Sequence, residues 1–344
     1  MDYKGKTALV TAIGSFSSMA VIGGLKKMGW RVVGCDIYPR EWIAQSLETA
    51  AFYQAPLARD EEKYLTFIRE VCLQEKVEMI LPLTDVEVDV FHRNRELFSG
   101  EHILVGISSP ETIALARNKF ALAKKVAASE GLGKPIPTVK LSEWNRKEWM
   151  GVYGSRLILK PWNGRSSSGL YRVRGEGELT RALEEIHEEG REEEYLVQPM
   201  IEGNVVTTDV VRGKDGSFAC LPRRELLRTL NGAGTSVQVF RNPELEQMCR
   251  KAADLLSITG CVNFEWIEER WGNGRCEYRF LECNPRFSGG VGFSCLAGYD
   301  MVQNHVRAFY GLPVEEENRA AEGYLAKVYR DVVTAGEGLE ENKA

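Results

Sequence analysis

The sequence predicts an α/β domain with a parallel sheet, followed by an α+β region with antiparallel sheets. Three observations support this division. The first hundred residues alternate short apolar runs with helical patterns, which is the order of a doubly wound parallel sheet. After a Gly/Pro-rich segment at 131–138, strand-like runs come in pairs, as they do in hairpins. The last pair flanks Asn273-Gly274, a dipeptide typical of a tight hairpin turn.

In the first region, apolar runs at 6–13 and 30–37 are predicted strands, and the segment 17–29 between them is a predicted helix that ends at Gly29. The elements expected next are helix 61–75, strand 77–84, helix 86–98 and strand 102–107. Ser109 is a predicted N-cap, because Pro110 stands at the first helical position. We expect that helical region to run to about residue 130.

The second region is predicted to contain paired strands and one charged helix. The expected strands are 155–161, 169–175, 195–200, 206–212, 218–226, 261–269 and 276–285. The acid-rich helix at 179–189 is interpreted as a solvated surface helix.

Composition and charge exclude several functional classes. The chain has 344 residues and a formal net charge of −5, so broad binding to nucleic acid or to a membrane surface is not expected. Its eight cysteines form no C-x-x-C pair, which predicts free thiols in a reducing compartment. No apolar run reaches the ~18 residues of a membrane span, and no signal peptide is recognised. We therefore expect a cytoplasmic protein.

The strand that ends in LECNPR carries an unusual set of polar side chains. Glu282, Asn284 and Arg286 occupy alternate positions, so they share one face, while Leu281 and Cys283 should share the other. A solvent-exposed strand face would be the ordinary explanation. The partner strand provides a reason to prefer a binding site.

If Asn273-Gly274 forms the turn, Glu265 lies opposite Glu282 and Asn263 lies opposite Asn284. Two carboxylates ~5 Å apart repel by roughly 3 kcal/mol at an effective dielectric constant of ~20. A shared proton would relieve this repulsion. An all-oxygen set of two carboxylates and an amide is also what Mg²⁺ prefers, and we favour a metal site.

Mg²⁺ held by few protein oxygens usually carries substrate phosphates. The segment LILKPWNGRSSSGLYRV offers Lys160 at the end of a strand, followed by a loop of glycines and serines. Glycines let backbone N–H groups approach phosphate oxygens. An ordinary flexible hairpin would have a similar composition, and the sequence is not a P-loop, because G-x-x-x-x-G-K-[ST] is absent.

Taken together, these motifs resemble the ATP-grasp superfamily, specifically its carbamoyl-phosphate-synthase-like, carboxylate–amine ligase branch. The matching motifs, in chain order, are Lys119 in ARNKF, Lys160 before its Gly-rich loop, the hinge YLVQPMIEG with Gly203, Asp209 in TTDVV, Glu265 in GCVNFEW, and Glu282, Asn284 and Arg286 in E-x-N-P-R. Gln198 and Val205 depart from the pattern, because acidic residues usually stand there. The resemblance covers about residues 1–330.

The resemblance implies a domain plan. A Rossmann-like pre-ATP-grasp domain is expected at 1–110, and a helical linker with the N-terminal ATP-grasp lobe at 111–200. The C-terminal lobe with the Mg²⁺ site would span 201–334, and 335–344 would be a flexible tail.

The resemblance also implies an activity. The chain would be an ATP-dependent ligase that joins a small, amino-acid-like carboxylate to an amine or thiol. It would form an acyl phosphate and release ADP and phosphate. The expected cofactors are ATP and two Mg²⁺ ions, which Mn²⁺ can replace, and the expected partners are small-molecule substrates and a second copy of the chain in a homodimer.

Roles are assigned to residues by the same resemblance. Arg286 and Arg224 are the catalytic candidates, and Arg223 and Arg228 could also anchor an anionic substrate. The metal ligands would be Glu265, Glu282 and Asn284. The residues expected to contact ATP are Lys119, Lys160, Ser167, Ser168, Gly169, Gln198, Met200, Glu265 and Glu282.

Two other functional classes stay open. A nicotinamide-dependent oxidoreductase would use Gly14 after the first strand and Asp36 at the end of the second. However, G-x-G-x-x-G would need glycines where Phe16 and Met19 stand. A non-catalytic sensor would bind Mg-ATP without consuming it, whatever acid and amine were offered.

Overall fold

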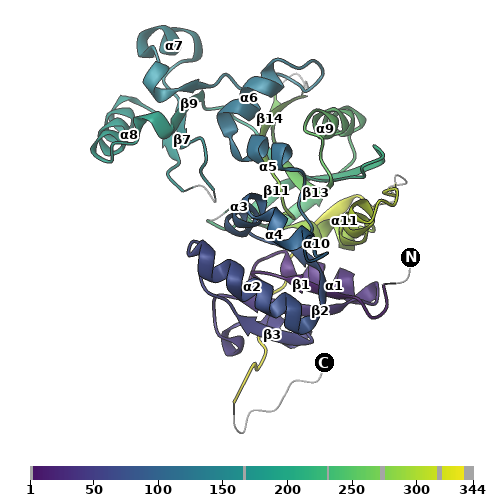
Figure 1. The fold of residues 1–344 in the computed structure, drawn as a ribbon. Coiled ribbons are helices and arrows are strands. Elements are labelled where there is room, and N and C mark those ends of the chain that lie inside the picture. Colours follow the sequence, from purple (N-terminus) through teal and green to yellow (C-terminus); the bar gives the residue numbers. More distant parts are fainter. Residues whose placement is uncertain (1–2, 166–167, 231, 272–275, 316–319, 337–344) are drawn as a thin grey trace.

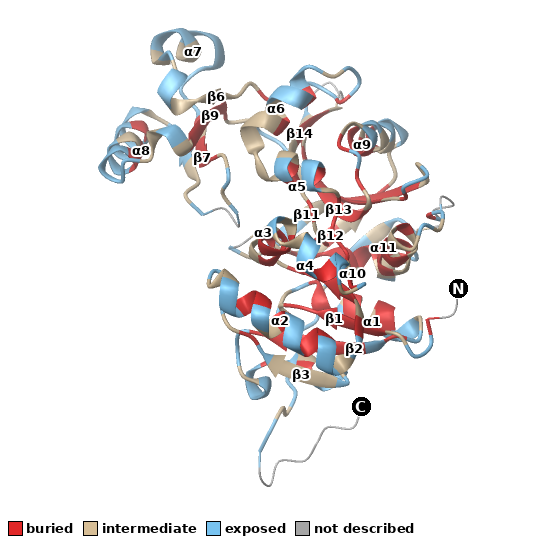
Figure 2. Ribbon diagram, in the orientation of Figure 1, coloured by how far each residue is buried: buried red, intermediate tan, exposed pale blue. Residues whose placement is uncertain are grey.

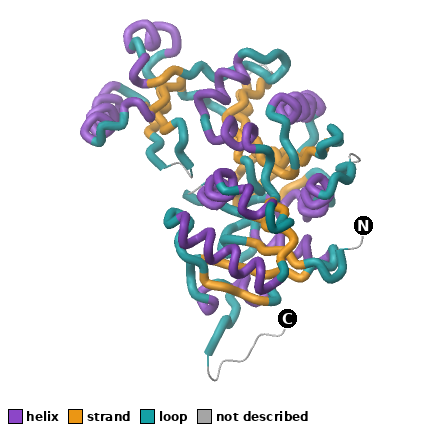
Figure 3. The backbone as a smooth tube through the Cα atoms, viewed as in Figure 1, coloured by secondary structure: helices purple, strands orange, loops and turns teal. Residues whose placement is uncertain are grey.

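The computed structural model describes residues 3–165, 168–230, 232–271, 276–315 and 320–336 (Figures 1 and 3). Its strands form three sheets of five, six and four strands. A parallel sheet comes first in the chain, and two antiparallel sheets follow. The predicted fold class is therefore confirmed. Within the described residues, no helix is long and apolar enough to cross a membrane.

The five-stranded sheet is parallel and has the order β3-β2-β1-β4-β5. Its strands are β1 (Thr7–Val10), β2 (Arg31–Asp36), β3 (Ala51–Gln54), β4 (Val77–Leu81) and β5 (Leu104–Val105). Its helices are α1 (Ser18–Lys27), α2 (Glu61–Glu75), α3 (Asp85–Arg93) and α4 (Arg95–Ser99), with 3₁₀ turns η1 (Arg40–Trp42) and η2 (Ala44–Glu48). The order of the strands reverses between β1 and β4, and ligands of open α/β sheets bind at such a point.

The predicted helical region that follows consists of two helices, α5 (Pro110–Arg117) and α6 (Lys119–Ala127). Asn118 between them has an extended backbone (φ −103°, ψ 91°), and its side chain accepts a hydrogen bond from the N–H of Ala121. Because Asn118 caps a new helix, Lys119 becomes the first residue of α6. Ser109 caps α5 as predicted, by accepting from the N–H of Thr112.

The four-stranded sheet is antiparallel and has the order β6-β9-β7-β8. Its strands are β6 (Val139–Lys140), β7 (Leu157–Pro161), β8 (Tyr171–Val173) and β9 (Tyr195–Pro199). The associated helices are α7 (Arg146–Tyr153) and α8 (Glu176–Glu188), with 3₁₀ turns η3 (Leu141–Glu143) and η4 (Glu192–Glu194). Three apolar residues of α8 are buried, and its acidic residues face outward (Figure 2), as expected for a solvated surface helix.

The six-stranded sheet is antiparallel and has the order β14-β13-β10-β11-β12-β15. Its strands are β10 (Asn204–Arg212), β11 (Phe218–Arg228), β12 (Gly234–Val239), β13 (Gly260–Arg270), β14 (Cys276–Asn284) and β15 (Gly323–Ala326). The helices of this region are α9 (Pro243–Leu255), α10 (Val291–Leu296) and α11 (Met301–Phe309). These three helices were not predicted from the sequence.

One hydrophobic core joins the parallel sheet to the six-stranded sheet. It contains Val21 and Leu25 of α1 together with Val302 and Val306 of α11, all of them buried (Figure 2). Helix α1 lies close to α11 at Gly24, where an added Cβ would be 2.8 Å from the Cβ of Val302. The two regions are therefore held together by packing, which fixes the loops after β1 and β4 relative to β13 and β14.

We expect Gly24→Ala to destabilise the protein by roughly 1–3 kcal/mol, because the new methyl group overpacks the contact with Val302. Gly23→Ala is the matched control on the same helix. A Cβ at Gly23 would meet no atom within 4 Å, and alanine favours a helix over glycine by up to about 1 kcal/mol. Urea unfolding of both variants measures the difference. Equal free energies of unfolding for the two variants would contradict the proposed close contact.

Candidate active site

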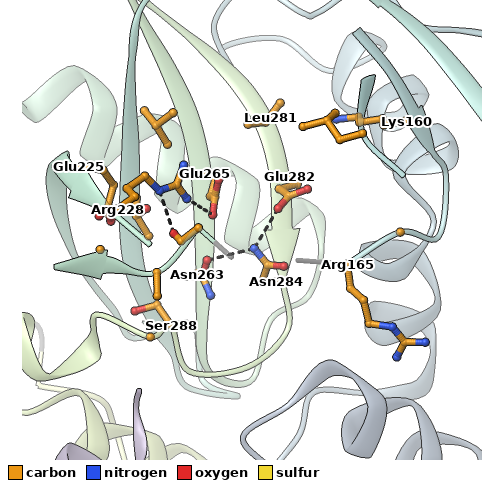
Figure 4. A pocket seen from close by; sticks show the side chains of 18 of the residues that line it. Lys160, Arg165, Glu225, Arg228, Asn263, Glu265, Leu281, Glu282, Asn284 and Ser288 are labelled. Atoms are coloured by element: carbon orange, nitrogen blue, oxygen red, sulfur yellow. Dashed lines mark hydrogen bonds and ion pairs between the residues drawn. The ribbon is translucent and has the colours of Figure 1, made fainter. Parts of the chain in front are cut away.

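A cavity of about 830 Å³ lies where the three sheets meet, a size typical of small-molecule sites. Strands β7 and β9 form one wall, and the β13–β14 hairpin forms another. The loops after β1 and β4 also reach it, through residues 15–17 and 83–86. Figure 4 shows how the polar side chains of the hairpin point into this space. The predicted metal and phosphate residues are therefore brought together in one place.

The register of the hairpin places the two acids as predicted. Glu265 pairs with Glu282, and Asn263 pairs with Asn284. Closer to the turn the register differs by one residue, because Trp266 pairs with Phe280 and leaves Leu281 as a bulge. The predicted turn at Asn273-Gly274 lies outside the described residues.

The bulge changes which side chains face the cavity. Leu281 was expected to share the inner face with Cys283, and this expectation is wrong. Leu281 lines the cavity beside Glu282, whereas Phe280 and Cys283 are buried in the core. A bulge inserts one extra residue, bends the strand and re-aims the side chain at that point. The hairpin thereby presents an apolar side chain directly next to its carboxylate.

The paired acids carry unequal charge. Burial and the neighbouring Glu282 raise the pKa of Glu265 to about 7. Burial alone would raise the pKa of Glu282 as well, but Lys119 and Lys160 outweigh it, and the pKa of Glu282 is lowered. Near pH 7 Glu265 is therefore partly protonated, which reduces the repulsion predicted from the sequence. A cation bound between the acids would displace that proton.

Two lysines face the acids from the other side of the cavity. Lys160 is 8% exposed on β7, and burial lowers its pKa to about 8, although Glu282 acts in the opposite direction. The Nζ of Lys119 lies 3.4 Å from Oε2 of Glu282 and donates a hydrogen bond of 2.6 Å to the carbonyl oxygen of Gly164. A positively charged wall therefore faces a negatively charged one, which suits a metal–phosphate ligand.

The Gly/Ser-rich loop reaches the cavity in part. Gly164, Arg165 and Ser168 line the cavity, whereas Ser167 lies outside the described residues. Gly169 is not among the residues that line it. Its φ of +70° and the short approach of the Tyr195 Oη, 2.8 Å from an added Cβ, explain the glycine at this position. The loop offers polar groups at the end of β7, next to Lys160.

The amide of Asn284 completes the oxygen set. Its Nδ2 donates to Oδ1 of Asn263 and to Oε1 of Glu282, both at 3.2 Å, so its own carbonyl oxygen stays available to a cation. Glu265, Glu282 and Asn284 are hard oxygen donors, which fit Mg²⁺. Burial and then the neighbouring Glu282 raise the pKa of Glu265, and a bound cation would favour its ionised form. The residues present therefore fit a divalent cation.

Of the two catalytic candidates, Arg286 and Arg224, only Arg286 lines the cavity. One terminal nitrogen donates to Oδ2 of Asp85 at 2.9 Å, and the other donates to the carbonyl oxygen of Phe287 at 3.1 Å. Asp85 was not predicted as a site residue. Its position directly after β4, at the edge where parallel strands end, was the signal that could have identified it.

Arg224 does not lie where a catalytic role would require it. Its guanidinium binds both oxygens of Glu268, at 2.7 and 2.8 Å, and lies 3.7 Å from the ring centre of Phe240. Adjacent residues of a strand point to opposite faces, so only one of Arg223 and Arg224 can reach the cavity. Arg223 lines the cavity, and Arg224 is not among its lining residues.

Arg223 and Arg228 both line the cavity at the end near the loop after β1. Arg223 donates to Oδ2 of Asp209 at 2.6 Å and to Oγ of Ser288 at 2.8 Å. Arg228 lies 3.4 Å from Oε1 of Glu265. These contacts hold positive charge beside the acid pair, as Figure 4 shows for Arg228.

Two predicted nucleotide contacts, Gln198 near the end of β9 and Met200 directly after it, also line the cavity. Gln198 donates from Nε2 to Oγ1 of Thr138 at 2.8 Å. The N–H of Met200 donates to the carbonyl oxygen of Arg156 at 2.8 Å, so this group is already engaged. Apolar side chains complete this wall, and they include Ile136, Ile158, Met200, Val205, Ile267 and Leu281. A flat, apolar heterocycle would fit such a wall.

The loop after β1 does not resemble a dinucleotide site. Asp36 accepts hydrogen bonds from the N–H groups of Gly14 at 2.8 Å and of Tyr38 at 3.2 Å. Its carboxylate therefore supports the loop backbone. The loop after β4 is fixed by a capping box between Thr84 and Glu87, which places Asp85 in the first turn of α3.

Comparisons with known proteins agree with this geometry. A family model described as "ATP-grasp in the biosynthetic pathway with Ter operon" matches residues 191–331. A D-alanine–D-alanine ligase of Oleidesulfovibrio alaskensis is 38% identical over 104 residues, 30% of this chain and 32% of that protein. The match thus spans about a third of that relative. A D-alanine–D-alanine ligase of Francisella tularensis subsp. novicida is 20% identical over 270 residues, 75% of this chain and 79% of that protein.

Solved structures share the fold. Biotin carboxylase from Campylobacter jejuni, in a βγ-ATP complex, has a TM-score of 0.75 and 16% identity, and the match covers 92% of this chain and 74% of that chain. The biotin carboxylase domain of Hydrogenobacter thermophilus 2-oxoglutarate carboxylase, a dimer with MgADP, ADP and bicarbonate, has a TM-score of 0.73 and 19% identity, over 92% and 73%. The predicted fold is confirmed, and the family model and the relatives support the predicted superfamily and the ligase class.

The raised pKa of Glu265 makes a prediction about stability without metal. The folded state binds the extra proton between about pH 4.5 and 7, so its stability falls as the pH rises through this window. Above pH 7 Glu265 is mostly ionised in the folded protein, where its charge is unfavourable. Glu265→Gln should therefore be more stable than the wild type at pH 8, by about 1–3 kcal/mol, and the difference should shrink towards pH 4.5.

Urea unfolding in the presence of a chelator, at pH 5 and pH 8, measures this difference. Adding Mg²⁺ at pH 8 should stabilise the wild type and should have little effect on the variant. A wild type that is equally or more stable than Glu265→Gln at pH 8 without metal would show that the acid pair is not strained.

Proposed function

We propose that the chain is an ATP-grasp enzyme, namely an ATP-dependent ligase that activates a small, amino-acid-like carboxylate. The family-model match over residues 191–331, the related ligases and the shared fold support this proposal. The product forms when an amine or a thiol displaces phosphate from the activated acid. The observation that carries this proposal is the acid pair Glu265 and Glu282 facing Lys119 and Lys160 across one cavity. Paired acids opposite paired lysines suit a metal–triphosphate.

ATP would lie with its phosphates between the two charged walls. Lys119 and Lys160 would bind the phosphates, and Gly164 and Ser168 would add polar groups from the loop. Glu265, Glu282 and Asn284 would hold Mg²⁺, as two ions that Mn²⁺ can replace. The metal would neutralise phosphate charge when bound. The apolar wall with Met200 and Leu281 would receive the base, and Gln198 would lie at its edge.

The substrate carboxylate would then attack the γ-phosphorus. A carboxylate oxygen–phosphorus bond forms, the bond from the γ-phosphorus to the bridging oxygen breaks, and ADP leaves. The amine attacks the acyl carbon in a second step, in which the new carbon–nitrogen bond replaces the carbon–oxygen bond and phosphate leaves. The amine loses a proton in that step. Arg286 would stabilise charge on the transferring phosphoryl oxygens, and Arg223 and Arg228 would attract an anionic substrate.

The remaining parts of the proposal concern the whole chain. We propose the domain division at 1–110, 111–200 and 201–334, with 335–344 as a tail. The partners would be small molecules, with no nucleic acid or membrane. Homodimer formation and a cytoplasmic location stay predictions. Arg224 is not retained as a catalytic residue, because it is held by Glu268 on the other face of the sheet.

A screen of phosphate release, with carboxylic acids crossed with amines and thiols, tests the proposal. A productive pair should release ADP and phosphate only when both substrates, ATP and Mg²⁺ are present. Glu282→Gln should lower kcat/KM at least about 10²-fold, because one wall of the phosphate site loses its charge. Glu269→Gln is the matched control, since Glu269 lies on the same hairpin but pairs with Arg279.

Turnover of Glu282→Gln at the rate of Glu269→Gln would contradict the assignment of the acid pair. Release of AMP and pyrophosphate would contradict attack at the γ-phosphorus.

A further inference from the structure

Asp85 connects the parallel-sheet region to Arg286 in the candidate site. It stands in the first turn of α3 and is 5% exposed. Its Oδ2 accepts from Arg286 at 2.9 Å, across 201 residues of sequence. Its Oδ1 is buried without a hydrogen bond and lies 3.6 Å from a terminal nitrogen of Arg117. A buried carboxylate is thus shared between two arginines from two other parts of the chain.

Alternating charges continue beyond this contact. Arg117 binds both oxygens of Asp89, at 2.8 and 3.1 Å. Asp89 in turn lies 3.8 Å from Arg165 in the Gly/Ser-rich loop. The order Arg286, Asp85, Arg117, Asp89, Arg165 therefore links the arginine at the end of β14 to the loop beside Lys160. Both acids belong to α3, so one helix of the parallel-sheet region contacts both sides of the cavity.

The position of Arg286 depends on which acid it binds. Glu265 and Glu282 also attract its guanidinium, and an ion pair with either of them would block the metal ligands. Asp85 competes with those acids, and it stays ionised: burial would raise its pKa, but Arg286 and Arg117 lower it overall. Without the charge of Asp85, Arg286 and Arg117 would repel each other, and Arg286 would move towards the acid pair.

We propose that Asp85 is a positioning residue, which holds the Arg286 guanidinium at the transferring phosphoryl group and away from Glu265 and Glu282. The catalytic site is then completed by the parallel-sheet region, and not by the ATP-grasp lobes alone. This inference rests on the proposed function, because it assigns phosphoryl contact to Arg286. It goes beyond that proposal because it requires an acid of α3 to position this arginine.

Asp85→Asn keeps the size of the side chain and removes its charge. We expect kcat to fall about 10²-fold, the usual consequence of misplacing a reacting group by ~1 Å, while KM for ATP changes less than about threefold. Glu268→Gln is the control matched for burial, because Glu268 is 1% exposed and paired with Arg224 outside the cavity. Its kcat per folded molecule should stay near that of the wild type.

A double-mutant cycle separates positioning from a general loss of packing. If Asp85 acts through Arg286, Asp85→Asn combined with Arg286→Lys should be no slower than Arg286→Lys alone. If the loss of kcat in the double variant equals the product of the losses in the two single variants, the inference is overturned.

Binding of MgADP with aluminium fluoride provides a readout without turnover, because this mixture mimics the transferring phosphoryl group. Calorimetry should show that Asp85→Asn binds MgADP like the wild type, but that the gain in affinity from aluminium fluoride is about 10²-fold smaller, in parallel with the rate. An undiminished gain in Asp85→Asn would overturn the positioning role alone. Absence of MgADP binding in the wild type would overturn the proposed function, and the inference with it.

Discussion

The pairing of Glu265 with Glu282 across the β13–β14 hairpin is the interaction on which the rest of the site depends. Two partly buried carboxylates opposite each other are costly unless positive charge faces them. Lys119 and Lys160 supply that charge from one side and Arg228 from another, and Asn284 orients Glu282. The pair still keeps a raised pKa on Glu265. A metal ion bound to a polyphosphate would therefore balance the charges of the acid pair and of the lysines that face it.

Local patterns were sufficient to predict the hairpin and its acids. Alternation along LECNPR placed Glu282 and Asn284 on one face, and pairing then placed Glu265 opposite Glu282, as the structure has it. Local patterns failed where a shift of one residue decides the outcome. The bulge moved Leu281 to the cavity, and the alternation in β11 turned Arg223 inward and Arg224 outward. No periodicity in a single strand specifies which of two neighbouring arginines faces inward.

Long-range contacts were beyond the sequence for a different reason. Asp85 and Arg286 are 201 residues apart, and their contact joins two regions that share one hydrophobic core. Asn118 is a second feature that the sequence did not predict. It separates α5 from α6 and makes Lys119 the first residue of α6. The Nζ of Lys119 then lies near Glu282. Packing between the regions therefore determines the geometry of the site, while the sequence motifs determine its chemistry.

The central claim is that a substrate carboxylate attacks the γ-phosphorus of ATP in this cavity. Transfer of ¹⁸O tests it most directly, because the oxygen that attacks phosphorus remains in the phosphate when the amine displaces it. With the substrate pair that supports turnover, labelled in the carboxylate, mass spectrometry of the released phosphate should find one ¹⁸O atom per turnover. Phosphate that carries no label, at full conversion of the acid, would show that no acyl phosphate forms and would contradict the account.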